Sequence, residues 1–232
     1  MGQIPYFEPM EAEVDGHKLK VVISGRERLA LLLELIEGAR STLRICFYIF
    51  GNDDVAAKVR SAMVAARLRG VRVWLLVDGF GSANWPDPVF QPLVDAGVVF
   101  SRFNPRWGRG YLLRNHQKMV IADNARAIIG GSNVLGHYYS DAPDGSSWHD
   151  LFLSIEGPAV TRLARFFDGL RRWTASERPT LRMLLHIFSR RSDKSGSLRW
   201  LFNGPFSRLS PLTRTLRQDI AAASRLDMIQ AY

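Results

Sequence analysis

The chain has 232 residues with a formal net charge of +9, and its hydrophobic fraction of 47% is ample for the core of one large domain, or of a domain plus an extension. A single cysteine, Cys46, excludes an intrachain disulfide. No basic-then-apolar signal peptide opens the sequence, and no apolar run reaches the roughly 18 residues of a transmembrane segment, so any membrane contact is expected to be peripheral, on the cytoplasmic side.

The apolar pattern predicts alternating helices and strands. Residues 1–20 are polar and irregular and are expected to form an arm or a first short strand. Helical spacing is found at 26–39, 53–69, 87–96 and 159–175, and strand-like apolar runs at 43–50, 71–77, 98–103, 119–121, 125–129 and 151–155. This order predicts an α/β fold in which a mixed sheet is flanked by helices and the functional site lies at strand ends.

One histidine and one lysine stand two residues apart at the start of the predicted strand at 119–121. If the extended conformation includes them, His116 and Lys118 point to the same side. A neutral imidazole can attack phosphorus and form a phosphoramidate that water or an alcohol then breaks. A lysine beside it would neutralise the non-bridging phosphate oxygens. The pair therefore indicates phosphodiester chemistry that needs no metal or other cofactor.

Other polar residues follow in a spacing that supports this interpretation. Asp123 ends the strand and is expected to orient a group or to stabilise charge in the site. The next strand ends in Gly130-Gly131-Ser132-Asn133, where the glycines would let the backbone approach a ligand and Ser132 and Asn133 would hydrogen-bond phosphate or a catalytic neighbour. Arg114 adds a further cation. The histidine–lysine pair alone is more often part of a solvated strand, and the Gly-Gly-Ser-Asn sequence alone is more often a turn. Only the two together indicate a site.

The pattern HxKxxxxD followed by GGxN resembles the first half of a phospholipase D superfamily protein, closest to the bacterial cardiolipin synthase branch. The resemblance implies a covalent phosphohistidine on His116, which would be one of a pair of active-site histidines. It also implies anionic phospholipid and a membrane surface as partners, and phosphatidyl transfer to an alcohol, or hydrolysis by water, as the reaction. Two alternatives stay open: a metal-independent homodimeric nuclease acting on nucleic acid, and a non-catalytic lipid-binding fragment.

A strongly basic segment follows the predicted domain. Residues 178–200 contain six arginines and lysines against one aspartate. Within it the apolar residues Leu181, Leu184, Leu185, Ile187 and Phe188 could line one side of a short helix. Such a helix could lie at a membrane interface, or its apolar side could pack on its own domain. Two interpretations also apply to the loop 104–113, which contains glycines and aromatic residues: it could be a mobile flap over the site or an ordinary surface loop.

The C-terminus resembles the start of the chain. A shift of 184 positions aligns Leu216, Ile220, Ala223, Ile229 and Tyr232 with apolar residues of the first predicted helix and strand. This predicts a phospholipase D-like domain at 1–177, a basic linker at 178–198 and the beginning of a second, truncated copy at 199–232. One histidine cannot both attack phosphorus and protonate the leaving alcohol, so a second motif is expected either from a missing C-terminal half, which is favoured, or from a homodimer.

Overall fold

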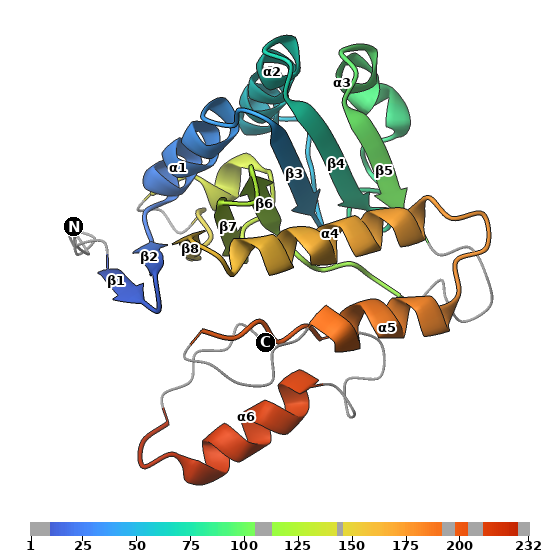
Figure 1. Ribbon diagram of the computed structural model, residues 1–232. Coiled ribbons are helices and arrows are strands. Elements are labelled where there is room, and N and C mark those ends of the chain that lie inside the picture. Colours follow the sequence, from blue (N-terminus) through green and yellow to red (C-terminus); the bar gives the residue numbers. More distant parts are fainter. Residues whose placement is uncertain (1–9, 105–112, 143–145, 192–197, 204–210, 227–232) are drawn as a thin grey trace.

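The computed structural model describes residues 10–104, 113–142, 146–191, 198–203 and 211–226 (Figure 1). The strands are β1 Met10–Val14, β2 His17–Val22, β3 Thr42–Phe47, β4 Arg72–Asp78, β5 Val99–Phe103, β6 Met119–Ala122, β7 Arg126–Gly130 and β8 Phe152–Glu156. The α-helices are α1 Gly25–Glu37, α2 Asp54–Leu68, α3 Gln91–Asp95, α4 Val160–Thr174, α5 Leu181–Arg191 and α6 Pro211–Ala222, and the short 3-10 helices include η1 Asp87–Phe90 and η3 Gly136–Tyr138.

All eight strands form a single mixed sheet, in the order β1-β2-β8-β7-β6-β3-β4-β5. The pairs β3–β4 and β4–β5 are parallel and the other five pairs are antiparallel. Strands β6 and β3 are neighbours in the interior of the sheet, and every one of their residues is buried. The predicted α/β fold with a mixed sheet flanked by helices is therefore confirmed.

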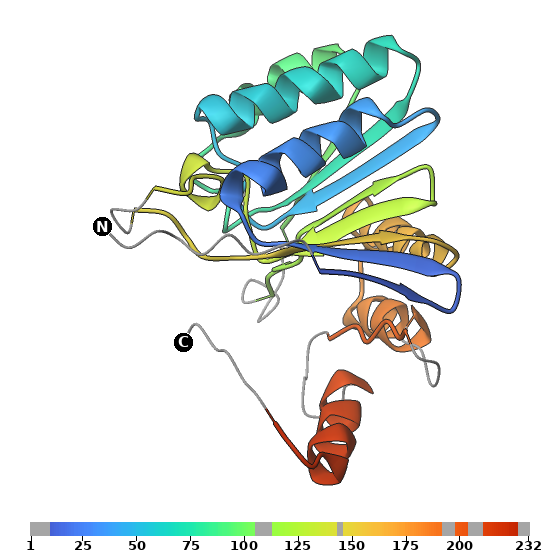
Figure 2. The ribbon, with the colours of Figure 1, turned by 90° about the vertical axis from the view of Figure 1, so that its left-hand side faces the viewer.

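Helices cover both faces of the sheet (Figures 1 and 2). On one face α1 and α2 bury apolar stripes that include Leu32, Ile36 and Val59 in the larger of two cores. The first turns of these helices are capped as their sequences suggest: the Ser24 hydroxyl accepts from the backbone N–H of Glu27, and the Asp53 carboxylate accepts from that of Ala56. On the opposite face α4 closes a second core.

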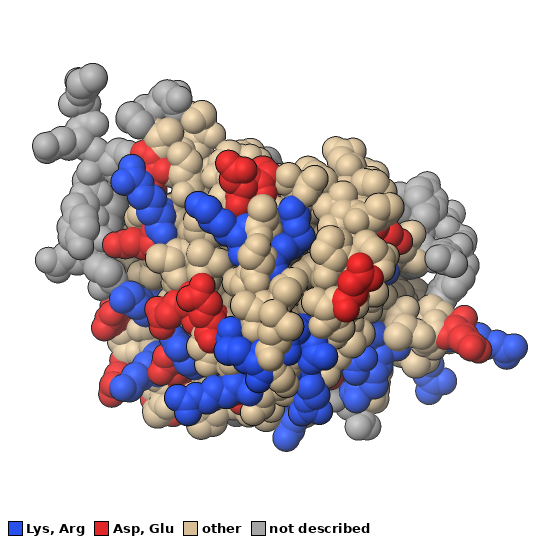
Figure 3. All heavy atoms as spheres, turned by 90° about the horizontal axis from the view of Figure 1, so that it is seen from above, with Lys and Arg blue, Asp and Glu red and all other residues tan. Residues whose placement is uncertain are grey.

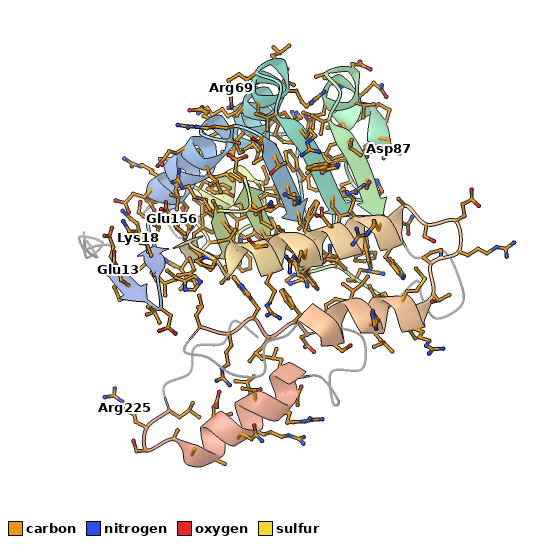
Figure 4. All side chains as sticks on the ribbon, viewed as in Figure 1. Glu13, Lys18, Arg69, Asp87, Glu156 and Arg225 are labelled. Carbon is orange, nitrogen blue, oxygen red and sulfur yellow. The ribbon has the colours of Figure 1, made fainter. Side chains whose placement is uncertain are left out.

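The N-terminal region differs from the expected arm or short strand, because residues 10–22 form the hairpin β1–β2. The turn places Asp15 and Gly16 at positive φ, 48° and 74°, as tight hairpin turns require. Lys18 lies opposite Glu13 on one side and Glu156 on the other, so opposite charges alternate across three strands (Figure 4). Each such pair stabilises the sheet by roughly 0.2–1 kcal/mol. Because charged residues occupy these positions, the two strands lack the apolar pattern by which a strand is recognised in a sequence.

The segment expected to be a basic linker contains α5, which packs on α4. Leu184 is 2% exposed, Ile187 lies against Gly169, and the ring of Phe188 meets Phe166 edge-on at 5.2 Å. Further along, the Phe202 ring stacks on Phe166 at 3.9 Å. Residues on both sides of the predicted boundary at 198 thus belong to the second core, while Met183 and Leu185 of α5 remain exposed. The division into domains remains a prediction.

Helix α6 coincides with the helical part of the predicted second copy. Two of its apolar residues, Leu216 and Ile220, are 48% and 46% exposed. Arg199 forms an ion pair of 3.5 Å with Asp219 on this helix. Ile229 and Tyr232, which carried the strand part of the match, lie outside the described residues. The helix is present, and the repeat remains a prediction.

Positive and negative side chains are mixed on one face of the molecule. Seen from the side covered by α1 and α2, Lys and Arg side chains are interspersed with Asp and Glu (Figure 3). Arg178, Arg182 and Arg199 of the basic segment are exposed, whereas residues 192–197 lie outside the described part of the chain. None of the helices in the described ranges combines the length and the apolar character needed to cross a bilayer.

Candidate active site

The histidine and the lysine lie at the carboxyl edge of the parallel strands. Residues 115–118 lead directly into β6, whose first residue, Met119, pairs with Cys46 near the end of β3. This edge of an α/β sheet is where side chains from neighbouring strands converge on a ligand. The structure therefore brings His116 and Lys118 together at the strand ends, as the spacing predicts.

The two side chains are in direct contact. Lys118 Nζ lies 3.0 Å from His116 Nδ1 and donates a hydrogen bond of 2.8 Å to the His116 carbonyl. The imidazole is exposed, whereas Lys118 is only 6% exposed. The Tyr48 ring packs at 4.5 Å from the His116 ring and at 5.2 Å from the ammonium group. The imidazole is thus accessible, while the ammonium group beside it is buried.

Burial and charge shift the acid–base properties of both groups. Loss of hydration lowers the pKa of His116, the Lys118 charge lowers it further, and Asp78 opposes the shift. Desolvation lowers the pKa of Lys118 to about 8, against opposing contributions from Cys46, Asp150 and Asp78. At neutral pH the histidine is therefore mostly neutral and the lysine mostly charged. This is the combination that a phosphorus nucleophile and a phosphate ligand require.

A buried carboxylate holds the segment before the histidine. Asp78, the last residue of β4, is 1% exposed and accepts the backbone N–H groups of Phe80, Gly81 and Asn115 at 2.7–2.9 Å. The Asn115 amide in turn donates to Cys46 Sγ at 3.2 Å. Asn115, the residue next to His116, is therefore held to β4 by its backbone and to β3 by its side chain.

Ser132 and Asn133 are buried and occupied by protein partners. The Ser132 hydroxyl donates to Asp150 at 3.0 Å, and the Asn133 amide accepts from the backbone N–H of Ile49 and donates to the Tyr138 hydroxyl. The two glycines make room for protein as well: a Cβ on Gly131 would lie 2.7 Å from the Asp150 carboxylate. Of the two expected partners, phosphate and a catalytic neighbour, the structure shows neighbouring protein groups, which gives Ser132 and Asn133 a supporting role, and a contact with phosphate remains a prediction. In that role they place Asp150, whose charge acts on Lys118.

Asp123 lies at the opposite end of β6 from His116, which corrects the expectation that it shares the site. The four residues of β6 that lie between them span roughly 13 Å at about 3.3 Å per residue. The Asp123 carboxylate accepts the backbone N–H groups of Arg40, Ser41 and Thr42 at 2.8–2.9 Å. It stabilises the turn between α1 and β3, with Asp123 itself at φ 54°.

Asp123→Asn is therefore expected to reduce stability and to leave the chemistry unchanged. The loss in free energy of unfolding at pH 7 should be about 1–2 kcal/mol, because a partly exposed carboxylate loses charge-assisted hydrogen bonds. Partial burial raises the pKa of Asp123, but the three backbone donors outweigh it and lower the pKa below 3.8. The contribution is thus present above pH 3.8 and is lost as the pH falls through the lowered pKa.

Urea unfolding followed by tryptophan fluorescence at pH 7 and pH 3 measures this difference. The exposed Glu37→Gln at the end of α1 is the matched control and should leave stability nearly unchanged. A full loss of activity in Asp123→Asn with unaltered unfolding would contradict the structural role.

A cavity of about 790 Å³ opens beside His116 and Lys118 and extends between the sheet and helices α4 and α5. Arg114 lines the same end, with its guanidinium 4.2 Å from the centroid of the Phe80 ring. The remaining walls are mostly aliphatic and aromatic. Residues 105–112, which contain most of the loop considered as a flap, lie outside the described residues. In the described ranges no group of three or more His, Cys, Asp or Glu side chains is arranged to hold a metal ion.

Known proteins are similar to this chain in sequence and in fold. A family model described as "Cardiolipin synthase, PLD-like domain" matches residues 32–168, more than half of the chain. Cardiolipin synthase A of Pseudomonas putida (strain W619) is 32% identical over 172 residues, 72% of this chain and 36% of that protein. The chain belongs to the cardiolipin synthase family of phospholipase D-like domains.

Solved structures of low sequence identity share the fold of this cardiolipin synthase-like chain. Phosphatidylserine synthase of Haemophilus influenzae Rd KW20 aligns with a TM-score of 0.55 at 13% identity, over 95% of this chain and 47% of that one. NucT from Helicobacter pylori aligns with a TM-score of 0.53 at 16% identity, over 67% of this chain and 96% of that one. The chain spans about 36% of the length of the first cardiolipin synthases that it matches.

Two acidic residues of this cardiolipin synthase-like domain were not singled out from the sequence. Asp78 is the last residue of β4, and Asp150 stands two residues before β8. The sequence did contain one signal for each, a lone carboxylate directly after or before a buried strand. Only the fold shows that both lie close enough to influence the charge of Lys118.

Proposed function

We propose that this chain carries one half of a phosphatidyl-transfer site, in which His116 forms a covalent bond to the phosphorus of a phospholipid. The observation that carries the proposal is the exposed His116 imidazole with the buried Lys118 ammonium 3.0 Å from its Nδ1. The family relationship supports the reaction class, since related proteins are named cardiolipin synthases.

The position of Lys118 defines the first step. A charged lysine donates to Nδ1, so a neutral imidazole carries its proton on Nε2 and cannot attack through that atom. An incoming phosphodiester offers Lys118 stronger, anionic acceptors, and the ammonium turns to them. The imidazole can then carry its proton on Nδ1 in place of Nε2, and the deprotonated Nε2 becomes the nucleophile. Substrate binding thus activates the histidine.

The transfer then proceeds in two displacements. His116 Nε2 attacks phosphorus, the bond from phosphorus to the leaving alcohol oxygen breaks, and that oxygen takes a proton from a second imidazolium. An acceptor alcohol next attacks phosphorus and gives its proton to the second imidazole, and the P–N bond breaks to restore His116. The second histidine would come from another copy of the motif, supplied by further sequence or by a partner chain.

Substrate class can be tested by comparing two binding partners at about 150 mM salt, where non-specific nucleic-acid binding is weakened. Flotation with phosphatidylglycerol vesicles is expected, with phosphatidylcholine vesicles as the control. Cleavage of single-stranded oligonucleotides is not expected. Nuclease activity without flotation would overturn the proposal in favour of a nucleic-acid phosphodiesterase, and flotation without any phosphotransfer in an assembly containing both motifs would favour a lipid-binding fragment.

A further inference from the structure

A half-open and mainly apolar cavity lies along the second core. The 790 Å³ cavity is within the size range of small-molecule sites, roughly 300–1,000 Å³. Leu163, Phe166 and Leu170 of α4, Leu184 and Phe188 of α5, and Phe202 contribute to its walls. An apolar occupant would make many van der Waals contacts with these walls and would remove their apolar surface from water.

Charge in the cavity is confined to one end. The cations Arg114 and Lys118 lie there beside the neutral His116, and no acidic side chain occurs among the described residues of the walls. A ligand that fits is therefore amphiphilic, with an anionic group at the cations and an apolar remainder directed toward α4 and α5. A nucleic acid would need cations and polar partners along its whole length, and a peptide would bury backbone groups without acceptors or donors.

From this arrangement we propose that the cavity binds one acyl chain of the phospholipid whose phosphate lies at Lys118 and His116. The inference rests on the proposed function and adds to it the part of the substrate that is recognised. Helix α5 then forms the outer wall of a lipid site, and its exposed residues Met183 and Leu185 lie on the outside of that wall. Affinity should accordingly depend on chain length as well as on the headgroup.

One tryptophan reports on occupancy. Trp200 lines the cavity and is held by a hydrogen bond of 2.9 Å from its indole N–H to the Ala159 carbonyl. The probe is lysophosphatidylglycerol with a mid-chain brominated acyl tail, used below its critical micelle concentration, because bromine quenches indole fluorescence at short range. Quenching should be saturable, and Trp200→Phe should remove most of it although five other tryptophans remain.

Chain length and one substitution make the test quantitative. Each added CH₂ between 8 and 14 carbons should tighten binding about fourfold. Leu153 is half-buried, faces the cavity beside Ile129 and can be enlarged: Leu153→Phe should weaken binding of the longest tail at least tenfold. Leu185→Phe on the outer surface of α5 is the matched control and should not change binding.

Two further outcomes separate this inference from the proposed function. His116→Ala should keep tail binding while losing phosphotransfer. Leu153→Phe should keep phosphohistidine formation from a diester without acyl chains, such as bis(4-nitrophenyl) phosphate, in the assembly that contains both motifs. Affinity that does not change with chain length, or quenching that persists in Trp200→Phe, would overturn the acyl-chain site. Thermal unfolding of each variant verifies that it is folded.

Discussion

His116→Ala is expected to abolish the covalent intermediate and to reduce phosphotransfer by about 10⁴-fold or more, as loss of a catalytic nucleophile does in other enzymes. The assay uses an assembly in which both motifs are present and a phospholipid labelled with ³²P. Rapid denaturation should trap a label on this chain that is labile in acid and stable in alkali, as expected of phosphohistidine. His149→Ala is the matched control, because His149 is exposed and outside the cavity.

The pH profile of label formation gives an independent check on the same residue. The lowered pKa of His116 places the acid limb below about pH 6.5, with the rate rising as the imidazole becomes neutral. The rate should fall again as Lys118 loses its charge near its pKa of about 8. Label that survives in His116→Ala, or label carried by another residue in the unaltered chain, would refute the assignment of the nucleophile.

Arg28→Met is expected to be the most destabilising single substitution considered, with a loss of about 3–5 kcal/mol in free energy of unfolding. Arg28 is 1% exposed, and its guanidinium donates to four backbone carbonyls: those of Ile23, Tyr138, Trp148 and Asp150. Methionine fills a similar volume but leaves these carbonyls without their donor. Lysine would not substitute, because one ammonium cannot reproduce the spread of a guanidinium.

The comparison variant for this prediction is Arg26→Met, two residues before Arg28 on the same helix. The Arg26 side chain is 84% exposed and contacts Asp141 only at 3.8 Å, so its loss should cost less than about 0.5 kcal/mol. Urea unfolding at equal pH and salt measures both. If the two variants lose equal stability, Arg28 does not hold Tyr138, Trp148 and Asp150 against α1.

Much of the fold could be predicted because its elements have local signals. Apolar periodicity and capping residues mark α1 and α2, and the buried strands β3, β4 and β6 read as continuous apolar runs. The hairpin β1–β2 could not be found in this way. Its strands are held by cross-strand charges and by pairing with β8, more than a hundred residues away.

The candidate site was predictable in part for a similar reason. His116 and Lys118 are neighbours in sequence, so local geometry alone brings them together. The partners of Asp123 lie about 80 residues earlier, at 40–42, and no local pattern indicates that its carboxylate faces them. Asp78 and Asp150 act on the lysine from separate strand ends, which only the assembled sheet brings near.

The two ends of the HxKxxxxD pattern therefore perform different tasks at opposite edges of the sheet. The spacing between the histidine and the aspartate matches the length of one strand, because the four residues of β6 cross the sheet once. The alternation of side chains along the strand then determines the direction in which His116, Lys118 and Asp123 point. An insertion of one residue within β6 would turn either the reactive pair or the carboxylate to the wrong side. A descendant that has lost the histidine and its chemistry should still keep the aspartate and the interval, because the scaffold rather than the reaction depends on them.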